Sequence, residues 1–208
     1  MFYFVKTPGW LKRIYDSYVW SIDSEEKKIY LTFDDGPHPV VTPYVLDQLK
    51  QYHARATFFC VGQNVEDHPG IYQQILSAGH KTGNHTYNHL NGWRTDNSLF
   101  MQDIAKATDF IQSNLFRPPY GKITSFQWKN LQSVMKVNDP KVIMWDVLSA
   151  DFDTSCTPVQ CLANVVLSTV PGSIVIFHDS EKAFPRLEYT LPRVLKYYSE
   201  LGYSFDSL

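Results

Sequence analysis

Cysteine is scarce in this sequence, because its 208 residues include only Cys60, Cys156 and Cys161. A small and odd number disfavours a framework of disulfides. Cys156 and Cys161 have four residues between them, a wider gap than that of the common zinc-binding cysteine pairs. Cys60 stands in an apolar run and is expected to be a small core residue. We therefore expect neither a cysteine-held metal nor a catalytic thiol.

The sequence also lacks an excess of either charge and a long apolar run. Its 19 Lys and Arg oppose 21 Asp and Glu, for a net charge of −2. A net charge this close to zero gives no indication of nucleic-acid binding. No stretch of the sequence approaches the ~18 apolar residues of a transmembrane segment. Lys6 and Pro8 interrupt the apolar start, so no secretory signal is visible. Either the protein stays in the cytoplasm, or its signal is not part of this chain.

Short apolar runs alternate with amphipathic stretches along the chain. The expected strands are 29–33, 56–61, 81–84, 116–117, 142–147, 173–177 and 203–205. The expected helices are 42–53, 64–78, 96–115, 125–137, 157–169 and 190–201. Such alternation predicts an α/β fold of parallel strands joined by helical crossovers. An open doubly wound sheet and a closed or nearly closed barrel both fit, and no G-x-G-x-x-G supports a dinucleotide-binding sheet.

A single domain is expected from the length and the hydrophobic fraction of 44%. Its core is expected to contain the apolar residues of four strands: Leu31, Phe33, Phe58, Cys60, Ile143, Trp145, Ile174 and Ile176. Nothing in the sequence indicates an oligomeric state.

Polar side chains follow most of the expected strands, at the end where parallel strands place their chemistry. His85 and His89 have a spacing that lets two imidazoles point to one side and grip one ion. A carboxylate from Asp34 or Asp35 would complete two histidines and one aspartate. Three protein ligands leave coordination positions open, which is typical of a catalytic metal, with Zn²⁺, Co²⁺ or Fe²⁺ as candidates. One aspartate would then be free to act as a base.

Five motifs occur in order and carry a resemblance to a known family. They are Thr32-Phe33-Asp34-Asp35-Gly36, His85-Thr86-Tyr87-Asn88-His89, Arg117-Pro118-Pro119-Tyr120, Ser149-Ala150-Asp151-Phe152 and Ile176-Phe177-His178-Asp179. The chain resembles the polysaccharide deacetylases, the NodB-homology domains of carbohydrate esterase family 4. The resemblance implies a distorted (β/α) barrel of about seven strands in residues 26–208. An aromatic-rich segment, residues 1–25, is expected to pack on that domain.

The resemblance also implies a function and the residues that perform it. It implies a hydrolase that uses a divalent metal, usually zinc, to remove N-acetyl groups from polymers or oligosaccharides such as chitin or peptidoglycan. Asp35, His85 and His89 would bind the metal. The other implied roles are Asp34 as general base, Arg117 as its partner, the Tyr120 backbone N–H as oxyanion donor, His178 as general acid and Asp151 as the partner of His178. Members of this family mostly act outside the cytoplasm.

The sequence departs from the family pattern beside the fourth motif aspartate. Phe152 stands where the family usually has tryptophan, which keeps an apolar wall but loses the indole N–H. Ile176 replaces a common leucine at nearly constant volume. Together with Trp93, these residues are predicted to contact substrate. The choice of Asp151 over Asp146 or Asp153 rests on the alignment of the motif.

Two other functions remain open at this point. An O-acetyl esterase acting on xylan-like chains would use the same site on a different bond. A carbohydrate-binding module with an inactive site is the third possibility, and the intact first motif argues against it.

Overall fold

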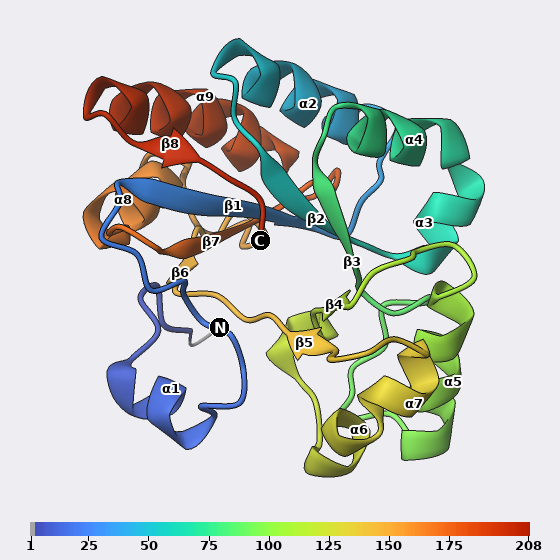
Figure 1. The fold of residues 1–208 in the computed structure, drawn as a ribbon. Helices are drawn as coiled ribbons and strands as arrows, with labels where there is room; N and C mark the ends of the chain where they lie inside the picture. Colours follow the sequence, from blue (N-terminus) through green and yellow to red (C-terminus); the bar gives the residue numbers. More distant parts are fainter. Residues whose placement is uncertain (1–2) are drawn as a thin grey trace.

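The computed structural model describes residues 3–208, and its centre is a curled parallel sheet (Figure 1). The sheet order is β5-β4-β3-β2-β1-β7-β6, and β8 pairs with the start of β1. The strands are β1 (Lys28–Asp34), β2 (Ala56–Cys60), β3 (Lys81–Asn84), β4 (Leu115–Phe116), β5 (Lys141–Val142), β6 (Val147–Leu148), β7 (Ile174–His178) and β8 (Ser204–Phe205). The prediction of a distorted (β/α) barrel with about seven parallel strands is confirmed.

Helices cover the outside of the curled sheet (Figure 1). They are α1 (Gly9–Ile14), α2 (Val41–Gln51), α3 (Gly62–Asp67), α4 (Pro69–Ser77), α5 (Asn97–Ala107), α6 (Ser125–Lys129), α7 (Leu131–Met135), α8 (Pro158–Ser168) and α9 (Phe184–Glu200), with a 3₁₀ turn at Pro119–Gly121. The helices α2, α4 and α9 lie along one side, while α5, α6 and α7 gather near β4 and β5.

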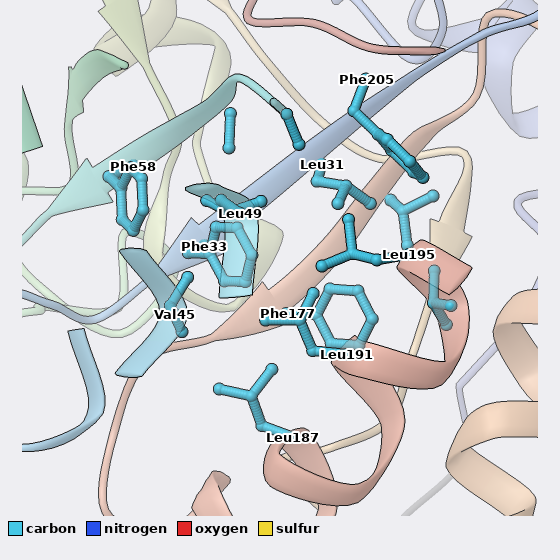
Figure 2. Close-up of a cluster of buried hydrophobic side chains, with 14 of the residues drawn as sticks. Leu31, Phe33, Val45, Leu49, Phe58, Phe177, Leu187, Leu191, Leu195 and Phe205 are labelled. Atoms are coloured by element: carbon cyan, nitrogen blue, oxygen red, sulfur yellow. The ribbon is translucent and has the colours of Figure 1, made fainter. Parts of the chain in front are cut away.

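The main core lies between the strands and the helices α2 and α9 (Figure 2). Phe33 of β1 stacks between Phe58 of β2 and Phe177 of β7, with ring centroids 5.0 and 5.9 Å away. Leu49 and Leu191 cover these rings from the helices and are fully buried. Burying each such side chain contributes roughly 1.5–3 kcal/mol, so this layer fixes where the strand ends lie.

Several helix boundaries differ from the prediction. The helix expected over 64–78 is two helices that meet at His68, because Pro69 starts the second one. The helix expected over 125–137 is likewise divided at Asn130, and the helix expected over 96–115 ends at Ala107. The helix expected to begin at residue 190 begins at Phe184. The helix expected over 42–53 begins one residue earlier, at Val41, so Thr42 lies inside its first turn.

The strand expected over 142–147 is also wrong. Only Lys141–Val142 and Val147–Leu148 belong to the sheet as strands β5 and β6. Between these two strands, the carbonyls of Ile143 and Met144 accept hydrogen bonds from the Arg117 side chain. Trp145 in this interruption is half-buried instead of fully buried, whereas the other predicted core residues are buried. A functional contact thus replaces regular sheet pairing here.

The N-terminal segment lies along this interrupted edge. Lys6 forms an antiparallel bridge with Val147 of β6, and Val19 forms a parallel bridge with Ile143. Lys6 and Lys12 both bind the buried carboxylate of Asp146, at 2.6 and 2.5 Å. Two cations and the Ser173 hydroxyl therefore satisfy this carboxylate, and hold its pKa below the usual value although burial raises it. Where the segment ends and the domain begins stays a prediction.

Candidate active site

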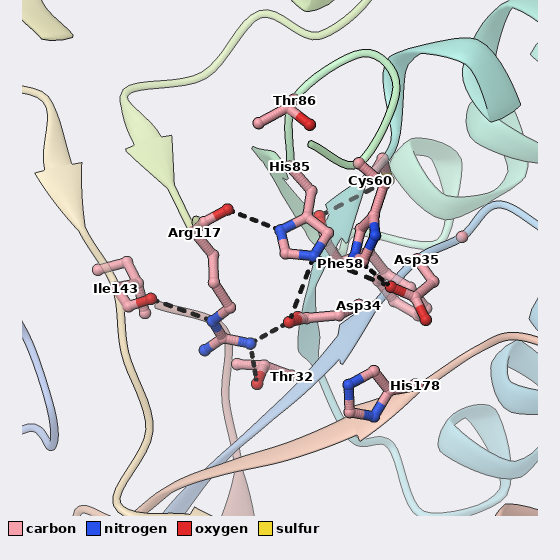
Figure 3. Close-up of polar contacts among 12 residues, drawn as sticks. Thr32, Asp34, Asp35, Phe58, Cys60, His85, Thr86, Arg117, Ile143 and His178 are labelled. Atoms are coloured by element: carbon pink, nitrogen blue, oxygen red, sulfur yellow. Dashed lines mark hydrogen bonds and ion pairs between the residues drawn. The ribbon is translucent and has the colours of Figure 1, made fainter. Parts of the chain in front are cut away.

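The predicted site residues lie at the carboxyl ends of neighbouring strands (Figure 3). Asp34 ends β1 and is in register with His178, which ends β7. His85 follows β3, and Arg117 follows β4. Figure 3 shows the side chains of Asp34, His85, Arg117 and His178 directed towards one another from four different strands. The parallel register of the sheet therefore assembles one site from motifs far apart in the sequence.

Asp35, His85 and His89 form a cluster that fits a metal ion. Each offers one ligand atom, and these atoms lie within 4.8 Å of one another. The Oδ1 atom of Asp35 is buried and accepts no hydrogen bond, although the Nε2 atoms of His89 and His85 lie 3.2 and 3.8 Å away. A buried carboxylate oxygen without a hydrogen bond is costly unless a cation satisfies it. The donor set of two imidazoles and one carboxylate suits a divalent metal.

The ionisation of the cluster also fits a metal. The His85 Nδ1 atom lies 2.6 Å from the carbonyl oxygen of Arg117, so it donates a hydrogen bond there and leaves Nε2 as the lone-pair nitrogen. Burial lowers the pKa of His85 to about 4, so the ring is neutral at pH 7. Burial raises the pKa of Asp35, but the facing imidazoles of His89 and His178 outweigh it and hold this pKa below the usual value. The cluster thus presents the neutral Nε2 atom of His85 and the ionised carboxylate of Asp35.

The Asp34 carboxylate has a different main partner from that of Asp35. Its Oδ1 atom accepts a hydrogen bond of 2.6 Å from the Arg117 guanidinium, which is fully buried. Arg117 is itself held by the Thr32 hydroxyl and by the two backbone carbonyls of the interrupted edge. The second oxygen of Asp34 lies 3.8 Å from His85 Nε2. One carboxylate oxygen is therefore fixed by a cation, and the other faces the metal cluster.

His178 and Asp151 form a second charged pair across the site. Asp151 is fully buried, and its two oxygens lie 2.7 Å from Nδ1 and 2.8 Å from the backbone nitrogen of His178. Burial lowers the pKa of His178, but Asp151 outweighs it and raises that pKa to about 9. The imidazole is therefore protonated at neutral pH. Of the three candidate aspartates, only Asp151 contacts this histidine, because Asp146 binds Lys6 and Lys12 and Asp153 binds Tyr3.

The remaining predicted residues lie at different depths. Tyr120 is exposed, its backbone has a φ of 61°, and its ring contacts that of His89 at 4.8 Å. Phe152 contacts the His178 ring at 5.2 Å. Ile176 is buried within β7, with only 2% of its surface accessible. Trp93 is exposed, donates its indole N–H to the Ile123 carbonyl and carries the Lys122 ammonium over its ring. No contact joins Trp93 to the metal cluster within residues 3–208.

Residues 21–135 match the family described as Polysaccharide deacetylase. This match covers more than half of the chain. The protein belongs to the polysaccharide deacetylase family. It is 34% identical over 192 residues to a peptidoglycan-N-acetylglucosamine deacetylase of Bacillus cereus, which covers 89% of this chain and 88% of that relative. A chitooligosaccharide deacetylase of Azorhizobium caulinodans is 33% identical over 166 residues, with 76% of each chain covered.

A solved structure of this family also resembles the protein throughout. The crystal structure of the Bc1960 peptidoglycan N-acetylglucosamine deacetylase superposes with a TM-score of 0.85 and 29% sequence identity, covering 97% of this chain and 95% of that chain. The similarity of fold therefore extends beyond residues 21–135 to nearly the whole chain. None of the helices in residues 3–208 combines the length and apolar character of a bilayer-spanning segment.

The structure reveals residues of this deacetylase site that the sequence analysis missed. Asp103 of α5 is buried and accepts hydrogen bonds from the backbone nitrogens of Tyr87 and Asn88, each 2.9 Å long. Its other oxygen accepts a bond from the Asn88 side chain. This carboxylate therefore holds the loop between the two metal-cluster histidines. Its signal in the sequence was an acidic residue on the apolar face of a predicted helix.

Asp179 was assigned no role, yet it supports the first motif. It is fully buried and accepts hydrogen bonds from the backbone nitrogen of Gly36 and from the Thr42 hydroxyl. A Cβ atom at Gly36 would lie 2.0 Å from an Asp179 oxygen, so only glycine permits this contact. The bond to Asp179 also explains why Thr42 does not cap α2.

Removing the Asp103 carboxylate is expected to weaken metal binding. Asp103→Ala deletes the acceptor of three hydrogen bonds in the loop that spaces His85 from His89. Supporting groups of this kind typically change metal affinity by about 10–100-fold, and we expect a loss near tenfold. Competition against a chromophoric chelator measures the Zn²⁺ affinity. Asp109→Ala, at an exposed position just beyond α5, is the control. Equal affinities for the two variants would contradict this role.

Proposed function

We propose that this protein is a metal-dependent deacetylase that removes N-acetyl groups from amino-sugar chains of the peptidoglycan or chitin type. One observation carries the proposal. The metal cluster meets two charged pairs, Arg117 with Asp34 and Asp151 with His178, at one end of the sheet. The names of the two relatives support the substrate class.

Asp35, His85 and His89 would hold the metal, with Zn²⁺ as the first candidate and Co²⁺ as an alternative. When bound, the ion polarises the amide carbonyl and makes water a better nucleophile. The three side chains leave the remaining coordination positions open for substrate and water. The neutral His85 ring and the ionised Asp35 are the forms that bind a cation, so no proton must leave either group first.

Asp34 acts as the general base in this proposal. Its fixed oxygen binds Arg117, and its other oxygen faces the metal cluster, where it takes a proton from the attacking water. The water oxygen then bonds to the carbonyl carbon of the acetyl group. The Arg117 guanidinium favours the ionised form of Asp34 and fixes its orientation.

His178 acts as the general acid. An amide nitrogen is a poor leaving group unless it receives a proton as the carbon–nitrogen bond breaks. His178 carries that proton at neutral pH because Asp151 raises its pKa to about 9. The products are acetate and a free amine on the sugar, and the proton taken by Asp34 balances the one that His178 gives.

The other predicted residues shape the substrate side of the site. The Tyr120 backbone N–H is assigned to the developing oxyanion. Phe152 provides an apolar ring beside His178, and Ile176 lies two residues before His178 in β7. Trp93 offers an exposed ring for stacking on a sugar further along the chain.

An acetate-release panel tests the proposal and separates it from the two alternatives. The zinc-loaded protein is incubated with chitooligosaccharides, peptidoglycan and acetylated xylan. Acetate from the N-acetylated substrates supports the deacetylase. Acetate from xylan alone would favour the esterase, and binding of sugar without acetate would favour a binding module. Keeping two buried charged pairs is costly, which argues against a binding module.

The pH dependence of the reaction should report the Asp151–His178 pair. We expect kcat/KM to stay high up to about pH 9 and to fall above it, because His178 loses its proton there. Asp151→Asn removes the carboxylate that raises this pKa, so the alkaline limb should move to lower pH. Rate profiles of the two zinc-loaded proteins measure the shift. An alkaline limb that is the same in both would show that a different group is the acid.

A further inference from the structure

The N-terminal segment reaches the acid side of the proposed active site. The backbone nitrogen of Leu148 donates to the Val5 carbonyl, and that of Thr7 donates to the Asp146 carbonyl, both at 2.8 Å. These bonds flank the antiparallel bridge between Lys6 and Val147 and place residues 5–7 beside β6. β6 leads directly into Ser149-Ala150-Asp151, and Asp151 binds His178. The antiparallel pairing therefore directs the residues before Val5 towards this part of the site.

Tyr3, two residues before Val5, makes two contacts near the active site. Its ring lies edge-on to the Phe152 ring, with centroids 5.7 Å apart. Its hydroxyl donates a hydrogen bond of 2.9 Å to an Asp153 oxygen. The other Asp153 oxygen accepts from the backbone and hydroxyl of Ser155. Burial and Asp153 raise the pKa of Tyr3 to about 12, so its hydroxyl keeps the proton that makes this bond.

Three consecutive residues thereby connect the N-terminal segment with the general acid. Asp151 binds the His178 imidazole, Phe152 contacts the same imidazole at 5.2 Å, and Asp153 binds Tyr3. The Phe152 ring thus contacts both the Tyr3 ring and the His178 ring. A phenylalanine ring has no hydrogen-bonding group of its own, so packing alone fixes its position.

We propose that Tyr3 is a positioning residue that holds Phe152 against His178, so that the N-terminal segment forms part of the acid side of the active site. The proposal rests on the deacetylase function proposed above. The segment is suited to this role because Lys6 and Lys12 fasten it to the buried Asp146, and the Thr7 hydroxyl donates to the Trp145 carbonyl.

A double-mutant cycle tests whether Tyr3 acts through Phe152. An aromatic pair of this kind has an effect of roughly threefold to tenfold, so Tyr3→Ala should lower kcat/KM by about that factor in the zinc-loaded protein. In a Phe152→Ala background, Tyr3→Ala should change kcat/KM less than about twofold. Tyr3→Phe keeps the ring and should retain most of the activity. Equal losses from Tyr3→Ala in both backgrounds would overturn the proposal.

A matched control and a second measurement complete the test. Ile14→Ala changes an exposed residue of the same segment and should leave kcat/KM and the melting temperature unchanged. The ring current of Phe152 should set the chemical shift of the His178 ring protons, assigned with His178→Ala. Tyr3→Ala should move this signal, and an unmoved signal would overturn the proposal even without activity. If the wild-type protein releases no acetate, the proposed function fails, while the His178 signal still decides the role of Tyr3.

Discussion

Replacing Asp34 by asparagine is expected to lower kcat/KM by about 10²–10⁴-fold while the protein still binds its metal. The amide keeps an acceptor for Arg117 but cannot take a proton from water. Metal binding should persist because Asp35, and not Asp34, belongs to the cluster with His85 and His89. Acetate release from chitooligosaccharides and the zinc content of the purified variant measure the two effects separately.

Asparagine is the informative substitution because the ion pair with Arg117 is buried. Deleting one partner of such a pair costs about 3–5 kcal/mol, because the other charge is left unpaired. Asp34→Asn also leaves the Arg117 charge uncompensated, but its amide oxygen can still accept the guanidinium hydrogen bond, so it should lose less stability than Arg117→Ala or Asp34→Ala. Asp34→Asn is compared with the wild type by thermal unfolding, and Asp35→Asn serves as the contrasting variant that should lose metal as well. Near-normal deacetylation by Asp34→Asn would show that another group is the base.

Replacing His178 by alanine is expected to have an effect of similar size on amide substrates. The loss should be about 10²–10⁴-fold, because the departing amine no longer receives a proton. An ester substrate should lose less, since an alcohol leaves more readily than an amine without protonation. Rates on chitooligosaccharides and on an acetate ester of the same sugar chain measure this difference.

Added imidazole provides the control for the His178 variant. Soluble imidazole that enters the vacated space should restore part of the amide activity in His178→Ala and none in Asp34→Asn. The zinc content should be normal in both variants, since neither residue belongs to the metal cluster. Amide hydrolysis by His178→Ala within a few-fold of the wild type would mean that the proton comes from another group.

Much of the site could be predicted because of how parallel strands are arranged. Their carboxyl ends meet at one face, so polar residues that directly follow β1, β3, β4 and β7 must lie close together. Asp34, His85 and His178 are recognisable in this way from the sequence alone. The resemblance to the family then distinguished Asp35 as ligand from Asp34 as base, a choice that spacing alone had left open.

The supporting contacts could not be predicted in the same way. Asp146 stands in an apolar run and looks like a residue of the site, yet it binds two lysines of the N-terminal segment. No local pattern links residues separated by more than a hundred positions in the chain. The interrupted strand at 143–146 was unpredictable for a related reason, because its carbonyls serve the Arg117 guanidinium, which approaches from β4.

Helix boundaries failed where local chemistry competed with hydrophobic spacing. The apolar pattern of 64–78 continues across His68 and Pro69, so periodicity predicted one helix where proline starts a second. At Thr42, a hydroxyl that usually caps a helix is instead bound to the buried Asp179. In both cases the chemistry of one residue decided the local structure, although the hydrophobic spacing of the surrounding residues suggested otherwise.

The central claim is that the metal cluster and the two charged pairs together hydrolyse an N-acetyl group. Its most direct test is to count acetate and free amine produced from a chitooligosaccharide by the zinc-loaded protein. We expect equimolar acetate and primary amine, loss of both after chelation, and return of both when Zn²⁺ is restored. A zinc-loaded, folded protein that binds the oligosaccharide and releases neither product, or one whose rate is unchanged after complete removal of the metal, would contradict it.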